Sequence, residues 1–183
     1  MRKLKHHEQR LLKKVDFLSW KGEGNLRENA ILARYGVTQR EDYSKYNRLA
    51  GMVTSLVSKL KALAPDSAFR IRSTEALLAK LFAMGLVPSG ASLAACESIP
   101  ASAFCRRRLP VVMVRLRMAQ SIKDAMAKIE SGAVRVGPEV VIDPAFLVTR
   151  SLEDFVTWVD SSNIKRVVAA YNDQLDDYDL LGE

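Results

Sequence analysis

The sequence has few of the residues that build cross-linked or metal-bound folds. Its 183 residues include two cysteines, Cys96 and Cys105, and two adjacent histidines, His6 and His7. Two cysteines nine positions apart, with no metal-ligand partner nearby, are expected to be reduced thiols of an intracellular protein. Adjacent histidines point to different faces of a helix, and no carboxylate cluster joins them. We therefore expect neither a metal site nor a cofactor.

Long hydrophobic runs are absent as well. No stretch approaches the ~20 apolar residues that a membrane-spanning helix needs, and the N-terminus has no apolar signal-peptide core. Hydrophobic residues still make up 48% of the chain, so it is long and apolar enough to bury a core in one medium domain or two small ones. We expect a soluble, globular protein that makes no membrane contact.

Signatures of catalysis are also missing. The chain contains no phosphate-binding loop, no nucleophile constellation and no pair of catalytic carboxylates. The aspartates between Asp173 and Asp179 lack the glycine and the terminal glutamate of a calcium-binding loop. The sequence therefore predicts a binding protein and not an enzyme.

Positive charge exceeds negative charge, and both are unevenly distributed. The 28 lysines and arginines outnumber the 21 acidic residues, for a formal net charge of +7. Residues 1–50 hold 12 basic and 6 acidic side chains, residues 106–139 hold 8 and 3, and residues 140–183 hold 3 and 9. Two basic blocks on a small folded protein indicate a polyanionic partner, of which nucleic acid is the commonest. The acidic end is predicted to discourage contact with unrelated RNA.

The first hundred residues predict helices. Apolar residues at helical spacing indicate helices over residues 4–18, 25–36, 41–63 and 74–84, followed by a loop with at most one helical turn over 86–101. Gly36 and Gly85 are the expected helix stops. The longest helix carries an apolar stripe with steps of three and four, which we expect to be buried. Its members are Tyr46, Leu49, Val53, Leu56, Leu60 and Leu63.

Residues 106–160 predict a small unit of helices and strands (the module). Pro110 is tolerated only in a first helical turn, so one helix begins near residues 107–109. Ser121 caps a second helix, which Gly132 terminates. Residues 134–136 and 140–142 form a hairpin, and further strands are expected at 146–149 and 155–158. The whole chain is thus expected to be α+β, with a helical region 1–105, the module 106–160, and a C-terminal helix with an acidic tail over 161–183.

Basic side chains are concentrated in the module. Arg115 lies two helical turns after Arg108, on roughly the same side. The planar fork of arginine favours bidentate contact with phosphate or a guanine edge. The candidate RNA contacts of the module are Arg106, Arg107, Arg108, Arg115, Arg117, Ser121, Lys123, Lys128 and Arg135. The N-terminal basic helix adds Lys3, Lys5, Lys13 and Lys14.

The order and spacing of these residues resemble a known RNA-binding fold. Over about fifty residues the module resembles the S-four RNA-binding domain of the uS-four ribosomal protein family, which holds RNA with a helix pair and a hairpin. The residues that carry the resemblance are Arg107-Arg108-Leu109, Val114, Leu116, Met118-Ala119, Ser121-Ile122, Ala125, Ile129, Val134-Arg135-Val136-Gly137, Pro144 and Phe146-Leu147-Val148.

Other segments narrow the resemblance to the S-four-type proteins of the U-three (U3) small nucleolar ribonucleoprotein. It covers essentially the whole chain and departs most at 22–35 and 86–102. It implies binding of U3 RNA and small-subunit pre-rRNA, assistance of their pairing during early rRNA processing, and a nucleolar location in the small-subunit processome beside Mpp-ten. The segments are Arg2-Lys3-Leu4-Lys5-His6-His7-Glu8-Gln9, Leu11-Leu12-Lys13-Lys14-Val15-Asp16-Phe17-Leu18, Arg40-Glu41-Asp42-Tyr43, Cys105-Arg106-Arg107-Arg108-Leu109-Pro110 and Asp154-Phe155-Val156-Thr157-Trp158-Val159-Asp160.

Two other functions compete with this interpretation. A structural protein of the small ribosomal subunit shares the fold, but the eukaryotic member ends in a basic, glycine-rich tail where this chain ends in acid. An RNA-modifying or tRNA-charging enzyme can carry the same domain as an accessory. Only about 25 residues follow Trp158, and the helical region has no catalytic signature, so we expect no room for a catalytic domain.

Overall fold

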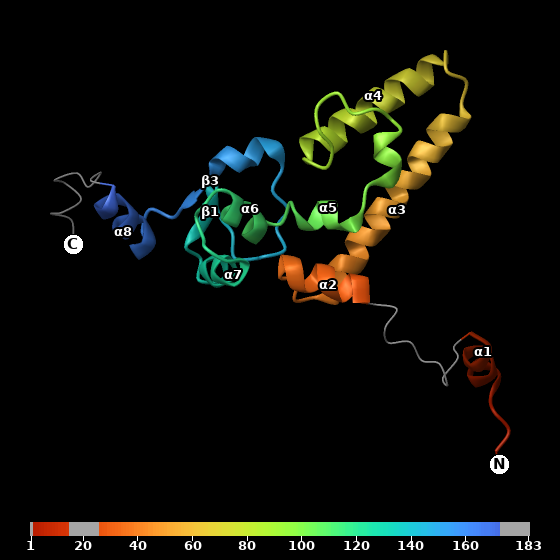
Figure 1. The fold of residues 1–183 in the computed structure, drawn as a ribbon, viewed down its shortest axis with the longest axis horizontal. Coiled ribbons are helices and arrows are strands. Elements are labelled where there is room, and N and C mark those ends of the chain that lie inside the picture. The colour runs from red at the N-terminus through yellow and green to blue at the C-terminus, as the bar shows by residue number, and fades with distance from the viewer. Residues whose placement is uncertain (1, 15–25, 173–183) are drawn as a thin grey trace.

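The computed structural model describes residues 2–14 and 26–172, and helices dominate them (Figure 1). Residues 15–25 and 173–183, which include the predicted start of the second helix and the acidic tail, lie outside the described residues. Helices and strands together make an α+β fold, as predicted. The helices are α1 (His6–Lys14), α2 (Leu26–Tyr35), α3 (Arg40–Ala62), α4 (Ala68–Ala83), α5 (Ala101–Cys105), α6 (Leu109–Arg115), α7 (Ile122–Glu130) and α8 (Asn163–Tyr171).

Shorter elements complete the fold. Two 3-10 helices, η2 (Ala95–Ser98) and η3 (Arg150–Phe155), precede α5 and the last strand. The strands are β1 (Val134–Val136), β2 (Glu139–Val140) and β3 (Val156–Trp158). None of the helices in the described ranges is both long and apolar enough to span a bilayer.

The two longest helices, α3 and α4, form a helical hairpin. The bounds of α3 agree with the prediction within a residue or two, but α4 begins at Ala68, six residues before the predicted start. Its first turns expose Phe69 and Ile71, so the apolar pattern of a buried face does not begin until later in the helix. Gly85 follows α4 with a φ of +72°, which confirms it as a helix stop.

The buried face of α3 differs from the predicted stripe. Tyr46 and Leu60 are buried as expected, but Leu49, Leu56 and Leu63 are 41%, 48% and 39% exposed. The small residues Ala50 and Val57 lie inside, where η2 and α5 pack closely against α3. The sequence pattern favours leucine for the core because it is large and apolar, whereas close packing of η2 and α5 on α3 leaves room for the smaller side chains.

Two hydrophobic clusters divide the described residues. The first (the front core) runs from Tyr35 to Cys105 and joins α2, α3, α4, η2 and α5. The second (the module core) runs from Leu109 to Val156 and joins α6 and α7 to the sheet. Both cysteines are buried as free thiols in the front core, and burial raises the pKa of each. Neither thiol is thereby favoured as a thiolate.

The sheet of the module has three antiparallel strands in the order β2-β1-β3. Arg135 pairs with Val140 on one side and with Thr157 on the other. The predicted strand at 146–149 is wrong, because this segment does not join the sheet. It runs beside the start of α6 instead, where Leu109 N–H donates to the Phe146 carbonyl at 2.9 Å and Arg108 and Leu147 form an isolated bridge.

The module joins the front through consecutive arginines that enter its first helix. Arg107 donates to the Val148 carbonyl at 2.9 Å from Nε and also pairs with Glu153. Its guanidinium lies so close to Gly85 that a Cβ there would meet the arginine Cζ at 2.7 Å. Gly85 therefore satisfies two requirements, a positive φ and a close approach.

The next arginine enters the front core. Arg108 is 2% exposed and donates from a terminal nitrogen (NH1) to Asp42 Oδ2 at 3.1 Å and to the Tyr46 hydroxyl at 3.4 Å. Asp42 is 7% exposed, so both charges of this ion pair have left water. A buried charge is tolerated only when it is paired, and Asp42 is the carboxylate that pairs with Arg108 among the described residues.

Removal of one member of this buried pair should destabilise the fold strongly. We expect Arg108→Met to lower the free energy of unfolding by about 3–5 kcal/mol, because Asp42 would lose its buried partner and keep only the exposed Lys45, whose Nζ lies 3.3 Å from Oδ1. The double variant Arg108→Met with Asp42→Asn should recover part of that loss. Arg115→Met, which breaks an exposed ion pair, is the control and should cost no more than about 1 kcal/mol. Chemical denaturation measures all three; equal losses in the two single variants would contradict the assignment.

Candidate nucleic-acid interface

The turn between α6 and α7 has an unusual backbone conformation. Arg117 has a φ of +61°, in the left-handed region that usually requires glycine. Its N–H donates to the Val114 carbonyl at 3.1 Å, and the Met118 N–H donates to the Met113 carbonyl at 2.9 Å, which together end α6. An arginine at the usual glycine position costs about 1 kcal/mol and holds a cationic side chain at this turn.

The start of α7 completes the turn. Ser121 is the N-cap as predicted, and its hydroxyl accepts from the Asp124 N–H at 3.2 Å. The turn encloses an open cleft of about 800 Å³ with both cationic and apolar side chains. Such a surface can accept phosphate charge together with the flat apolar face of a sugar or base. The cleft is lined by Val114, Arg117, Met118, Ala119, Gln120, Ser121, Asp124 and Lys128.

Three of the predicted basic contacts are exposed around the module. Arg117 and Lys123 have no ion-pair partner among the described residues. Arg106 is also exposed and donates from Nε to the Tyr35 hydroxyl at 3.3 Å, a contact that ties it to the end of α2. These side chains can reach an RNA phosphate without breaking a salt bridge to a described carboxylate.

Three other predicted contacts are held by carboxylates. Arg115 pairs with Glu153 at 2.7 Å, and Lys128 pairs with Asp124 at 2.9 Å while lying 5.6 Å from the Trp158 ring centroid. Arg135 pairs with Asp160 at 2.6 Å and donates to Thr157 Oγ1 at 3.1 Å. The sequence does not reveal these partners. Glu153 and Asp160 lie more than twenty residues from the arginines they bind, and Asp124 lies on the same helix as Lys128, where a carboxylate is usually just solvated.

The carboxylates in these pairs are held in the ionised state. Hydrogen bonding to Lys128 lowers the pKa of Asp124, and hydrogen bonding to Lys165, with the charge of Arg135, lowers that of Asp160. For Glu153 burial is the largest single influence and opposes ionisation. The contacts with Arg115 and Arg107 together outweigh it, so its pKa is lowered. The paired cations are thus oriented by permanent negative charges.

Arg107 and Arg108 lie inside the molecule and not on its basic surface. They are 5% and 2% exposed, and both guanidinium groups contact protein acceptors. Asp42 and Tyr46 were not recognised from the sequence as partners of Arg108. A signal was present, since Asp42, Tyr46 and Ala50 are spaced by four residues on one helix face. A carboxylate in a buried stripe requires a cation nearby.

The predicted N-terminal contacts lie far from the module in the sequence, on or just before α1, a helix with no buried residues. Lys13 and Lys14 form the last turn of α1, while Lys3 and Lys5 precede the helix. All four are exposed. Within the described residues no ion pair or hydrogen bond joins their side chains to the module.

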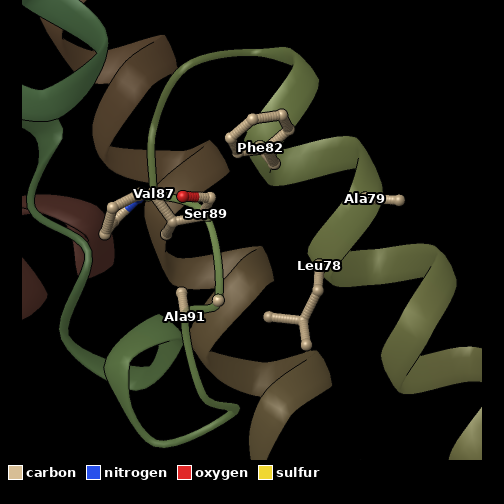
Figure 2. Close-up of a pocket in the computed structure, with 8 residues that line it drawn as sticks. Leu78, Ala79, Phe82, Val87, Ser89 and Ala91 are labelled. Atoms are coloured by element: carbon tan, nitrogen blue, oxygen red, sulfur yellow. The ribbon is translucent and has the colours of Figure 1, made fainter.

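An apolar hollow of about 270 Å³ lies between α4 and the loop that follows it (Figure 2). Figure 2 shows Leu78 and Phe82 on α4 facing the loop that carries Val87 and Ala91. Its lining includes one hydroxyl, that of Ser89, and no titratable side chain, so it lacks the groups that catalysis needs. No cluster of three or more metal-ligating side chains occurs in the parts of the chain that the structure describes.

Two protein-family models match the chain. Residues 3–99 match the ribosomal protein S4/S9 N-terminal domain, and residues 107–154 match the S4 domain. The second match covers α6, α7, β1, β2 and most of η3, which include the cleft with Arg117 and Lys128 and the exposed Lys123.

Relatives match the chain along nearly its whole length. It is 57% identical over 181 residues to the U3 small nucleolar ribonucleoprotein protein IMP3 of Mus musculus, covering 98% of each chain. The protein of the same name from Saccharomyces cerevisiae is 51% identical over 181 residues, covering 98% of this chain and 99% of the relative. The small ribosomal subunit protein uS4 of Hyperthermus butylicus is 29% identical over 143 residues, covering 78% and 80%. On these matches the chain belongs to the IMP3 family of S4-type proteins.

Proposed function

We propose that this chain is an RNA-binding factor of small-subunit ribosome biogenesis. It binds U3 small nucleolar RNA and small-subunit pre-rRNA in the nucleolus and assists their pairing during early rRNA processing. The observation that carries the proposal is the 57% identity to a U3 ribonucleoprotein relative over 98% of the chain. The S4 domain of this chain also contains a cleft lined by Arg117 and Lys128. Mpp-ten and other processome proteins are the proposed protein partners.

The surface chemistry supports a role in holding RNA without chemical reaction. Two RNA strands repel each other through their phosphates, and a folded cationic surface lowers that repulsion. Arg117 and Lys123 are available for this, and Arg106 extends the surface toward α2. The relatives described above are named as ribonucleoprotein and ribosomal proteins, and we propose that this protein likewise has no catalytic activity.

The paired cations can also reach RNA, at a cost. A phosphate that replaces Asp124, Asp160 or Glu153 would take over an arginine or lysine that is already oriented. The displaced carboxylate would then be hydrated, which is inexpensive at the exposed Asp160 and costs more at the half-buried Glu153. We propose that Arg115, Lys128 and Arg135 join the interface in this second way, whereas Arg107 and Arg108 support it from inside.

The domain division follows the two clusters. We propose a helical region over 1–105 that anchors the protein in its particle, the RNA-binding module over 106–160, and a terminal segment over 161–183. The separate front core and module core support this division. A structural protein of the mature small subunit is the alternative. It is supported by the uS4 match, which is weaker in identity and in coverage than the matches to IMP3.

Crosslinking in living cells identifies the RNA. We expect the protein to crosslink to U3 RNA and to small-subunit pre-rRNA, because a U3 small nucleolar ribonucleoprotein protein matches it over 98% of its length. Sequencing of the crosslinked RNA is the measurement. Recovery of mature small-subunit rRNA alone would favour the ribosomal alternative and overturn the proposal.

Loss of the freely exposed cations should weaken RNA binding. We expect Arg117→Ala with Lys123→Ala to reduce affinity for U3 RNA roughly tenfold near physiological salt. The slope of log affinity against log salt should fall by about 2, one for each lost phosphate contact. Arg72→Ala with Lys80→Ala on α4 removes the same charge far from the cleft and is the control. If both pairs change the slope equally, the cleft is not the contact surface.

The strained residue separates stability from binding. Arg117→Gly should raise the free energy of unfolding by up to about 1 kcal/mol, because glycine adopts a positive φ without steric cost. Arg117→Ala keeps the Cβ and should leave stability nearly unchanged. Both variants should weaken RNA binding to the same extent. Thermal unfolding and a filter-binding titration test this; wild-type affinity in Arg117→Gly would show that the side chain makes no contact.

A further inference from the structure

A row of apolar side chains lies exposed along one face of α3 and at its end. Leu49, Met52, Leu56 and Leu63 are 41%, 57%, 48% and 39% exposed. Their steps of three, four and seven residues place them on one face of the helix. Large apolar residues are unremarkable when scattered singly, but a continuous row of them marks a surface that another molecule covers.

The row leads into a groove between α3 and α4. Figure 1 shows that the two helices are joined at one end and diverge from there. The groove has a volume of about 370 Å³ and is mainly apolar. Its lining includes Leu56 and Leu60 from α3, Leu63 directly after that helix, and Phe69, Ser73 and Leu77 from α4.

The borders of the groove are basic. Lys59 lies at the groove itself, three residues after Leu56, and Arg48 lies one turn before Met52 on the same face of α3. On α4, Arg72 and Lys80 each follow an apolar lining residue by three positions. None of these four cations forms an ion pair with a carboxylate of the described residues. Residues 43–83 contain seven basic and only two acidic side chains.

We propose that this groove binds an acidic amphipathic helix of a partner protein. Leucines spaced by three and four residues accept the apolar face of a helix, and the basic borders attract the carboxylates that flank such a face. A second copy of this chain fits poorly, because its basic borders would face basic borders. RNA fits less well, since four of the seven lining residues are leucines, which neither stack on bases nor bind phosphate, against a single ring (Phe69) and a single cation (Lys59).

The length of the row sets the length of the ligand helix. From Leu49 to Leu63 the helix rises about 21 Å, at 1.5 Å for each residue. A partner helix of about four turns therefore covers the row and the groove. The proposed function calls for protein partners, and the groove indicates the chemistry of one of them. The groove shares no lining residue with the cleft between α6 and α7, so binding at the groove can be tested without RNA.

A pair of designed peptides tests the charge preference with the full-length protein. One fluorescein-labelled 18-residue peptide has leucines at helical spacing and glutamate at its other positions, and the second has lysine in place of each glutamate. We expect the acidic peptide to bind at least tenfold more tightly by fluorescence anisotropy and to weaken as salt rises. Equal binding of both peptides, or binding of neither, would overturn the proposal.

Three variants test the location. Leu56→Asp should reduce the affinity for the acidic peptide at least tenfold. Ile71→Asp should change that affinity less than twofold, because Ile71 is equally exposed (49%, against 48% for Leu56) but lies on the face of α4 away from the groove. Lys59→Glu should lower the affinity for the acidic peptide and raise the affinity for the lysine peptide. A variant that merely fails to fold would lose affinity for both. Circular dichroism melting checks that each variant is folded.

Other occupants give different results. If Leu56→Asp converts a dimer to a monomer in sedimentation, the groove binds a second copy and the proposal is wrong. If Leu56→Asp weakens U3 RNA binding as much as Arg117→Ala with Lys123→Ala does, the occupant is RNA and the proposal is wrong. Peptide binding that survives when U3 RNA binding is absent would reject the proposed function and leave the groove assignment intact.

Discussion

The buried ion pair between Arg108 and Asp42 is the interaction on which the arrangement of the rest depends. It joins the residue before α6 to the first turns of α3, and so links the module to the front core, against which Val111 and Leu147 of the module also pack. Burial raises the pKa of Tyr46, despite the opposing charge of Arg108, which keeps this hydroxyl neutral beside the pair. A hydrophobic contact would tolerate sliding between the clusters. A desolvated charge pair does not, because either ion without the other is very costly.

Consecutive arginines in this protein have different roles because the backbone turns between them. Arg106 faces solvent, Arg107 reaches the segment before η3, and Arg108 enters the front core. The proposed RNA surface is consequently centred on the turn that carries Arg117, with the exposed Arg106 at its edge. There the charges are either unpaired among the described residues or matched by an exposed carboxylate, two arrangements that leave them accessible to phosphate.

Much of the fold could be predicted from the sequence, and the errors have physical causes. Helix bounds followed from local signals such as Pro110 at a first turn and Ser121 at a cap, which act within a few residues. The inner face of α3 did not follow, because the small Ala50 and Val57 lie where η2 and α5 pack against this helix, a contact with no local signal. For the same reason, composition revealed a basic module but not which arginines it buries. The choice depends on partners such as Asp42 and Glu153, which are more than forty residues away.

Glu153 accepts from Arg107 inside the junction and from Arg115 at the surface. One carboxylate thus serves two cations, and they compete for its charge. Arg107 also donates from two nitrogens to the Val148 carbonyl, so its position does not depend on Glu153 alone. Arg115 is half-exposed and has no second ionic partner among the described residues. The same carboxylate therefore lies between one arginine that the fold holds in place and one that is free to move away.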